Sequence, residues 1–255
     1  MGRYLALVPI ALALAACGGG GGGGALSLDP VASAAEKTSK QETSKIEFTM
    51  SSSGFRATGT GAADDDSMRM SMDFRYKGKS THLTVVVVGD TFYVSSPIFR
   101  KDPTYPKGKD WFKLDMKAAA KAQGIDFDSL TPSNELDVLG GSTGKPRKIG
   151  AERVRGVETT HYEATIDLDA AAAKASGKTG EALRKMVGAS GTKTIPFEVW
   201  VDKHRLVRRM AFSERLGPGK PSVRLVLTLY DFGAPVSIKA PPSDKVFDAT
   251  KYATP

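Results

Sequence analysis

The chain contains a single cysteine, Cys17, and its surroundings decide what its thiol can do. It ends the tetrapeptide Leu-Ala-Ala-Cys at residues 14–17, and seven glycines follow at residues 18–24. A positive charge at Arg3 and a short apolar run at residues 4–13 precede it. A basic start, an apolar centre and small residues before a cut are the layout of a secretory signal peptide. We therefore expect the first residues to be a leader for export.

The tetrapeptide at residues 14–17 resembles the bacterial lipobox, in which the cysteine sulfur receives a diacylglycerol and the leader is cut just before it. The resemblance implies a signal peptide over residues 1–16, then an acylated Cys17 with a flexible Gly-rich tether over residues 17–29. A spanning helix needs about twenty apolar residues, more than this leader offers. The alternative is an ordinary signal peptide with a stray cysteine near the cut.

Other residues that could carry chemistry do not form a recognisable site. The three histidines, His82, His161 and His204, have no further ligand at the spacing of a metal site. The sequence Ser-Gly-Lys-Thr at residues 176–179 ends like a phosphate-binding loop, but Ala172 stands where its first glycine belongs. No nucleophile elbow occurs. We therefore expect that the protein has no catalytic residue, no cofactor and no metal, and that it is not an enzyme.

The charge balance is basic, with a net charge of +8 and an isoelectric point near 9.4. Basic residues are not interleaved with aromatic ones as base stacking would require, so we expect no nucleic-acid partner. Attraction to an anionic membrane surface and a solvated surface without a specific partner both remain open. With the one cysteine acylated, no disulfide is available, and we expect a monomer that is stabilised by packing alone.

The elements that position these residues are mostly strands. A short helix is expected over residues 30–44, and from residue 45 the hydrophobic period changes to two. Strands are expected over residues 45–50, 55–61, 68–76, 81–88, 91–95, 111–115, 147–154, 157–168, 194–202, 205–215 and 221–230. Helical inserts are expected over residues 116–123, 126–130, 132–139, 169–175 and 181–187, and an irregular tail over residues 235–255.

This order of elements predicts one α+β domain over residues 30–255. Consecutive strands with helical inserts at two points favour a single strongly curved antiparallel sheet, a half-barrel with one wet face. Helices that gather on the other, concave face would cover it.

One strand has an unusual composition. Met68, Met70, Met72, Phe74 and Tyr76 alternate with polar residues and so share one face. Methionine is flexible and polarizable, and it adapts to irregular or changing apolar partners. Simple core packing is the competing interpretation of this stripe.

Together these features resemble the LolA-like lipoproteins, specifically the actinobacterial LppX–LprG group. Local similarities are Gly-Asp-Thr-Phe-Tyr-Val at residues 89–94, the strand at 157–167, Phe-Glu-Val-Trp-Val-Asp at 197–202 and Asp-Phe-Gly-Ala-Pro-Val at 231–236. These motifs are structural, so no active-site residue can be transferred. The resemblance implies a half-barrel whose concave face, closed by helices, holds the acyl chains of a lipid or glycolipid.

We therefore predict a lipid-binding lipoprotein that is exported and anchored to the outer face of the cell membrane, for lipid transport or sensing. The alternative is an interaction or sensory module of the same fold that engages an envelope membrane protein. The residues expected to line the cavity are Met68, Met70, Met72, Phe74, Met210, Phe212, Leu225 and Leu227 from the sheet, and Leu136, Val138, Leu139 and Met186 from the inserts.

Overall fold

The computed structural model describes residues 30–101, 105–118, 145–174, 184, 188, 193–215 and 222–250. Its helices are α2 (Pro30–Ser39), α5 (Leu168–Lys174) and the short 3₁₀ turns η2 (Phe99–Lys101) and η4 (Ser243–Lys245). Its strands are β1 (Ser44–Ser52), β2 (Phe55–Ala63), β3 (Ser67–Tyr76), β4 (Lys79–Val88), β5 (Thr91–Ser95), β6 (Trp111–Asp115), β7 (Arg147–Val154), β8 (Val157–Asp167), β9 (Thr194–Asp202), β10 (Val207–Arg215), β11 (Ser222–Tyr230) and β12 (Val246–Asp248).

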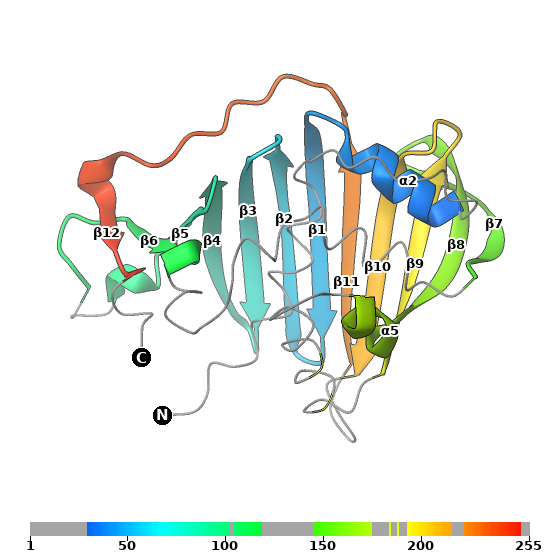
Figure 1. The fold of residues 1–255 in the computed structure, drawn as a ribbon. Coiled ribbons are helices and arrows are strands. Elements are labelled where there is room, and N and C mark those ends of the chain that lie inside the picture. Colours follow the sequence, from blue (N-terminus) through cyan, green and yellow to red (C-terminus); the bar gives the residue numbers. More distant parts are fainter. Residues whose placement is uncertain are drawn as a thin grey trace.

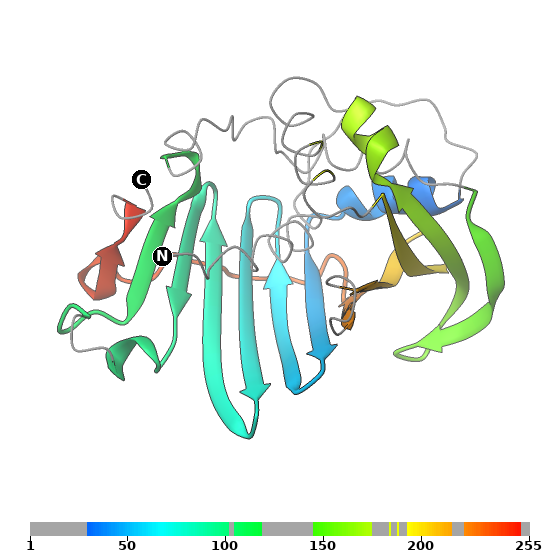
Figure 2. The ribbon, with the colours of Figure 1, turned by 90° about the horizontal axis from the view of Figure 1, so that it is seen from below.

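All these strands belong to one open sheet in the order β12-β6-β5-β4-β3-β2-β1-β11-β10-β9-β8-β7. Every neighbouring pair is antiparallel except β12 and β6. The first strand, β1, pairs with β11, so the two halves of the chain meet in the middle of the sheet (Figure 1). The sheet bends strongly, and α2 and α5 lie inside the bend (Figure 2). The expected single curved antiparallel sheet is confirmed.

The tail differs from the expectation of an irregular segment. Residues 231–245 pass across the ends of the strands from β11 to the other side of the sheet (Figure 1), and β12 then pairs parallel to β6. The side chain of Lys113 forms an ion pair with Asp248 at 3.0 Å. Hydrogen bonds from Thr250, and then Lys113, hold the pKa of Asp248 at about 2. A three-residue strand is too short to show a period of two, so only these tertiary contacts define it.

The buried face of the sheet combines very small and very large side chains. On β2 the inward positions include Gly59 and Gly61, which lie between β1 and β3. A Cβ on Gly61 would overlap the Arg69 carbonyl oxygen and the Met70 sulfur. A Cβ on Gly59 would lie 2.7 Å from the Met72 Cγ and would overlap a backbone oxygen of β3. The methionines of β3 therefore occupy space that only glycine on β2 leaves open.

This close approach predicts different effects at two strand glycines. Gly61→Ala should destabilise the domain by about 2–3 kcal/mol, because backbone atoms of β3 cannot move aside cheaply. Gly150→Ala on β7 is the matched control, since a Cβ there meets nothing within 4 Å. It should change the free energy of unfolding by less than about 0.5 kcal/mol. Urea denaturation of both variants measures the difference, and equal losses would contradict the close-approach argument.

Candidate functional site

The sheet residues predicted to line a cavity do share one face of the molecule. Cross-strand pairing places Met210 opposite Leu227, and Phe212 opposite Leu225. The buried members of the set are no more than 8% exposed, and Met70 is fully buried. These are Met68, Met70, Met72 and Leu227. The partly buried members, which pack against buried residues of the same face, are Phe74, Met210, Phe212 and Leu225.

This apolar face continues across most of the sheet. One cluster of buried side chains spans β1, β2, β3, β4 and β11, and a second spans α2, β8, β9 and β10. Met210 packs against both clusters and so joins them. Val31 and Ala34 of α2 and Leu168 of α5 belong to the second cluster. The two described helices thus cover the β8–β10 part of the face, which agrees with helices on the concave side.

The remaining predicted lining residues, Leu136, Val138, Leu139 and Met186, lie outside the described residues. Their contribution to the concave face stays a prediction. The acylation of Cys17 and the boundaries of leader, tether and domain also stay predictions, because residues 1–29 are outside the described part.

The opposite, convex face carries a compact polar cluster. The side chain of His161 on β8 is only 13% exposed. The register of β8 and β9 places it opposite Trp200, and the two rings stack with centroids 4.1 Å apart. Glu198 approaches the His161 ring at 3.1 Å, and Glu152 accepts a hydrogen bond from the Trp200 indole at 2.6 Å. Aromatic stacking, which local sequence does not show, buries this histidine.

The described residues contain no group of histidine, cysteine, aspartate or glutamate side chains that could hold a metal ion. His82 instead bonds to the neighbouring Asp73 at 2.9 Å on an exposed surface. In the described part of the chain, no helix is both long and apolar enough to span a membrane.

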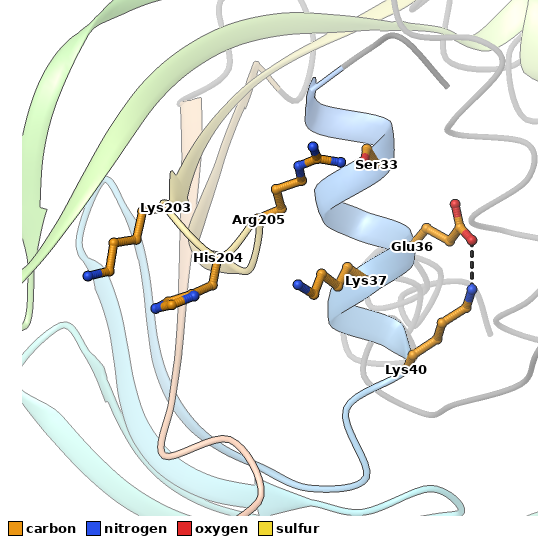
Figure 3. Close-up of a pocket in the computed structure, with 7 residues that line it drawn as sticks. All are labelled: Ser33, Glu36, Lys37, Lys40, Lys203, His204 and Arg205. Carbon is orange, nitrogen blue, oxygen red and sulfur yellow. Dashed lines mark hydrogen bonds and ion pairs between the residues drawn. The ribbon is translucent and has the colours of Figure 1, made fainter. Parts of the chain in front are cut away.

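A second surface feature lies at one end of the strands, where α2 approaches the turn between β9 and β10. It is an open pocket of about 470 Å³ (Figure 3). Most of its lining side chains are basic or can become so. The lining residues are Ser33, Glu36, Lys37, Lys40, Lys203, His204 and Arg205. We call this feature the basic pocket.

The buried Asp202 holds the turn of the basic pocket in shape. Its carboxylate accepts hydrogen bonds from the backbone N–H groups of His204 at 2.8 Å and Leu206 at 2.9 Å. The Arg208 guanidinium donates to the same carboxylate at 2.7 Å. Burial alone would raise the pKa of Asp202, but the hydrogen bonds from Leu206 and Arg208 hold it below the ordinary value. The turn is therefore fixed by an ionised carboxylate that is shielded from water.

The helix of the basic pocket is hydrogen-bonded to the start of β10. The Val207 N–H at the start of β10 donates to the Thr38 hydroxyl at 2.8 Å, and this hydroxyl donates to the Ala34 carbonyl oxygen of α2 at 2.7 Å. Sequence reasoning missed this pocket, because residues 33–40 and 203–205 are far apart along the chain. The only local signals were the predicted helix after the tether and the turn at Lys203 and His204.

Comparison with known proteins gives one related sequence and several similar structures. No family model matches the chain. A Streptomyces griseus protein, described as an uncharacterized 31.2 kDa protein in the rplA-rplJ intergenic region, is 28% identical over 151 residues. The match covers 55% of this chain and 48% of that protein. The chain therefore matches about half the length of this relative.

Among solved structures, the Mycobacterium tuberculosis lipoprotein LppX is similar at 14% identity and a TM-score of 0.46, covering 82% of this chain and 94% of that one. LprF from Mycobacterium bovis is similar at 15% identity and a TM-score of 0.44, covering 79% and 90%. The first of these structures bears a name from the group that the sequence resembles.

The fixed turn predicts a pH-dependent loss of stability. Asp202→Asn should lower the free energy of unfolding by about 2–4 kcal/mol near neutral pH, because Arg208 and two backbone donors lose a buried carboxylate. A lowered pKa in the folded state means that this contribution is complete above the ordinary aspartate value, near pH 4, and is lost as the pH falls through the folded-state pKa.

Urea denaturation at neutral pH and below pH 4 measures this effect. The gap between the wild type and Asp202→Asn should be constant above about pH 5 and narrow in acid. Asp65→Asn, in an exposed turn, is the control and should match the wild type. A gap that does not change with pH would contradict an ionised Asp202.

Proposed function

We propose that this protein is a membrane-tethered lipoprotein that binds the acyl chains of a lipid or glycolipid on its concave face. The observation that supports this most is the continuous apolar face, which runs from β4 to β8 and is rich in methionine. Burial of hydrocarbon against such a face is favourable by about 25 cal/mol for each Å² of apolar area removed from water. A flexible, polarizable lining suits a ligand with many conformers.

The leader supports the tether. An acylated Cys17 would hold the chain at a bilayer, because each buried methylene contributes about 0.8 kcal/mol. Residues 17–29 would then behave as a flexible linker with a reach of about 20 Å. The sheet would stay close enough to the membrane to exchange lipid with it.

Ligand entry has to displace side chains from this face, because its central residues are packed together. Met70 and Met72 lie over the β2 glycines, and Met70 is fully buried. Methionine has three rotatable side-chain bonds, so these residues can change rotamer with little strain. We propose that acyl chains enter between the sheet and its cover and take the volume that these side chains leave.

The same packing favours a second candidate function. Met68, Met70 and Met72 are as well buried as a conventional core, with exposed fractions of 8%, 0% and 5%. In that case the domain would hold no lipid and would act as an interaction or sensory module toward an envelope protein. The two candidates differ in one observable, which is a lipid bound in stoichiometric amount.

Neighbouring residues on β11 offer a matched test of lipid binding. Leu225 packs on the concave face, and Val226 packs on the convex face. Both are partly buried. The convex residues that Val226 packs against are Val154, Trp200 and Ala211. Leu225→Glu should abolish a lipid adduct, because a carboxylate in the apolar face strongly disfavours hydrocarbon contact. Val226→Glu should keep the adduct.

Native mass spectrometry of the mature chain, residues 17–255 with Cys17→Ser, measures the adduct after expression in an actinobacterial host. Thermal unfolding checks that both variants fold. A wild-type protein that carries no lipid and takes up neither phospholipid nor glycolipid would contradict the carrier proposal and favour the interaction module.

Acylation of Cys17 has its own test. The N-terminal peptide of the wild-type protein should begin at residue 17 and carry the mass of a diacylglycerol thioether. Cys17→Ser should lack both features, because serine has no thiol to acylate. Peptide mass spectrometry reads out both. A wild-type Cys17 that reacts with a maleimide would carry a free thiol, and lipidation at this position would then be wrong.

A further inference from the structure

We propose that the basic pocket between α2 and the β9–β10 turn binds the phosphate groups of anionic phospholipids at the membrane surface, and that it thereby orients the domain. The inference rests on the proposed membrane tether, but it concerns a separate site from the apolar face. The charged side chains of the basic pocket would bind headgroups at the bilayer surface, whereas the concave face would bind acyl chains.

The charges of the pocket suit an anion. Lys37, Lys40, Lys203 and Arg205 are basic residues, and Glu36 is the one carboxylate among the lining residues. Glu36 is already paired with Lys40 at 2.7 Å. The ion pairs found among the described residues do not include Lys37, Lys203 or Arg205. Three cations thus remain for an external phosphate.

The lining side chains come from two elements, α2 and the β9–β10 turn. Lys37 projects from α2 toward the turn, and Arg205 extends toward Ser33 on the helix (Figure 3). Arg205 adopts a left-handed backbone conformation, with φ of +59°. Lysine supplies a point charge to phosphate, whereas arginine adds a planar fork of donors. The hydroxyl of Ser33 adds an uncharged donor to the pocket.

The scaffold of the pocket is rigid. The Asp202 carboxylate holds the turn through His204 and Leu206, and the hydroxyl of Thr38 holds α2 to the start of β10. A pocket whose walls are fixed loses less conformational entropy when it binds a headgroup. The backbone positions that carry the cations are therefore fixed, while the side chains of Lys37, Lys203 and Arg205 are exposed to solvent.

The position of the pocket along the chain selects the membrane as its partner. The described part of the chain begins at Pro30, directly after the proposed tether, and the helical lining residues lie on α2, which begins there. With a proposed tether reach of about 20 Å, α2 is the first described element after the tether and would lie near the bilayer. Basic side chains near an anionic leaflet contribute about 1 kcal/mol each, which is about a fivefold gain in partitioning.

Vesicle co-sedimentation tests the pocket directly. The mature chain, residues 17–255 with Cys17→Ser, is mixed with phosphatidylcholine vesicles that do or do not contain one-third phosphatidylglycerol, at about 0.1 M salt. The wild type should bind the anionic vesicles and not the neutral ones. The combined variant Lys37→Gln, Lys203→Gln and Arg205→Asn should lose roughly a hundredfold in partitioning. Asparagine tolerates the left-handed backbone of residue 205.

A second combined variant removes the same number of charges on the side of the sheet formed by the opposite ends of the strands. Arg56→Gln, Lys79→Gln and Lys148→Gln change exposed residues near the far ends of β2, β4 and β7. This control should lose less than about fivefold, because charges beyond a Debye length are screened. Equal losses in both variants would overturn the proposal in favour of a diffuse effect of net charge.

Two further outcomes would also overturn it. Binding of inorganic phosphate by calorimetry without binding of anionic vesicles would assign the pocket to free phosphate. Equal binding to both kinds of vesicle would exclude headgroup charge as the determinant. The pocket variant should keep the lipid adduct in native mass spectrometry, and Leu225→Glu should keep vesicle binding. Failure of this inference is therefore distinguishable from failure of the proposed function.

Discussion

The architecture depends on the fit between the glycines of β2 and the methionines of β3. Strand pairing sets Ile46, Gly61 and Met70 in one row across the sheet, and Phe48, Gly59 and Met72 in the next. Each row places a residue without a side chain between two large ones, so the large side chains lie across the centre of the sheet. This arrangement makes the apolar concave face continuous across the centre of the sheet.

The same fit connects packing to function. Side chains that lie flat over glycine leave volume when they rotate, and methionine rotates at small cost. Under the proposed function, the concave face would be a closed core without ligand and a binding wall with one. Rigidity is placed elsewhere, at the stacked His161 and Trp200 on the convex face and at the Asp202 turn. These contacts join β8 to β9 and fix the turn between β9 and β10, and they would keep these strands in register if the apolar face repacked around a ligand.

The molecule separates its two proposed contacts with lipid. Hydrocarbon would meet the apolar face, where burial of area supplies the free energy. Headgroups would bind the basic pocket at the turn between β9 and β10, where the attraction between opposite charges supplies the free energy. Higher ionic strength should weaken headgroup binding at the basic pocket. It should leave acyl-chain binding at the apolar face almost unchanged, since salt does not screen the burial of apolar area. Such a division lets a tethered domain stay oriented at the surface whether or not the concave face holds an acyl chain.

The sequence alone determined the strands, the shared face of Met68, Met70 and Met72, and the single curved sheet, because a period of two along the chain encodes both strand and face. It also indicated the leader and the acylation site at Cys17, which lie outside the described residues and stay predictions. Only the tertiary structure decided the rest. Strand β12 is too short for periodicity, His161 is buried by a ring on another strand, and the basic pocket joins Lys37 to Lys203. Each of these features arises where segments far apart in the chain meet: β12 with β6, β8 with β9, and α2 with the β9–β10 turn. Contacts between distant segments leave no periodic signal in either one.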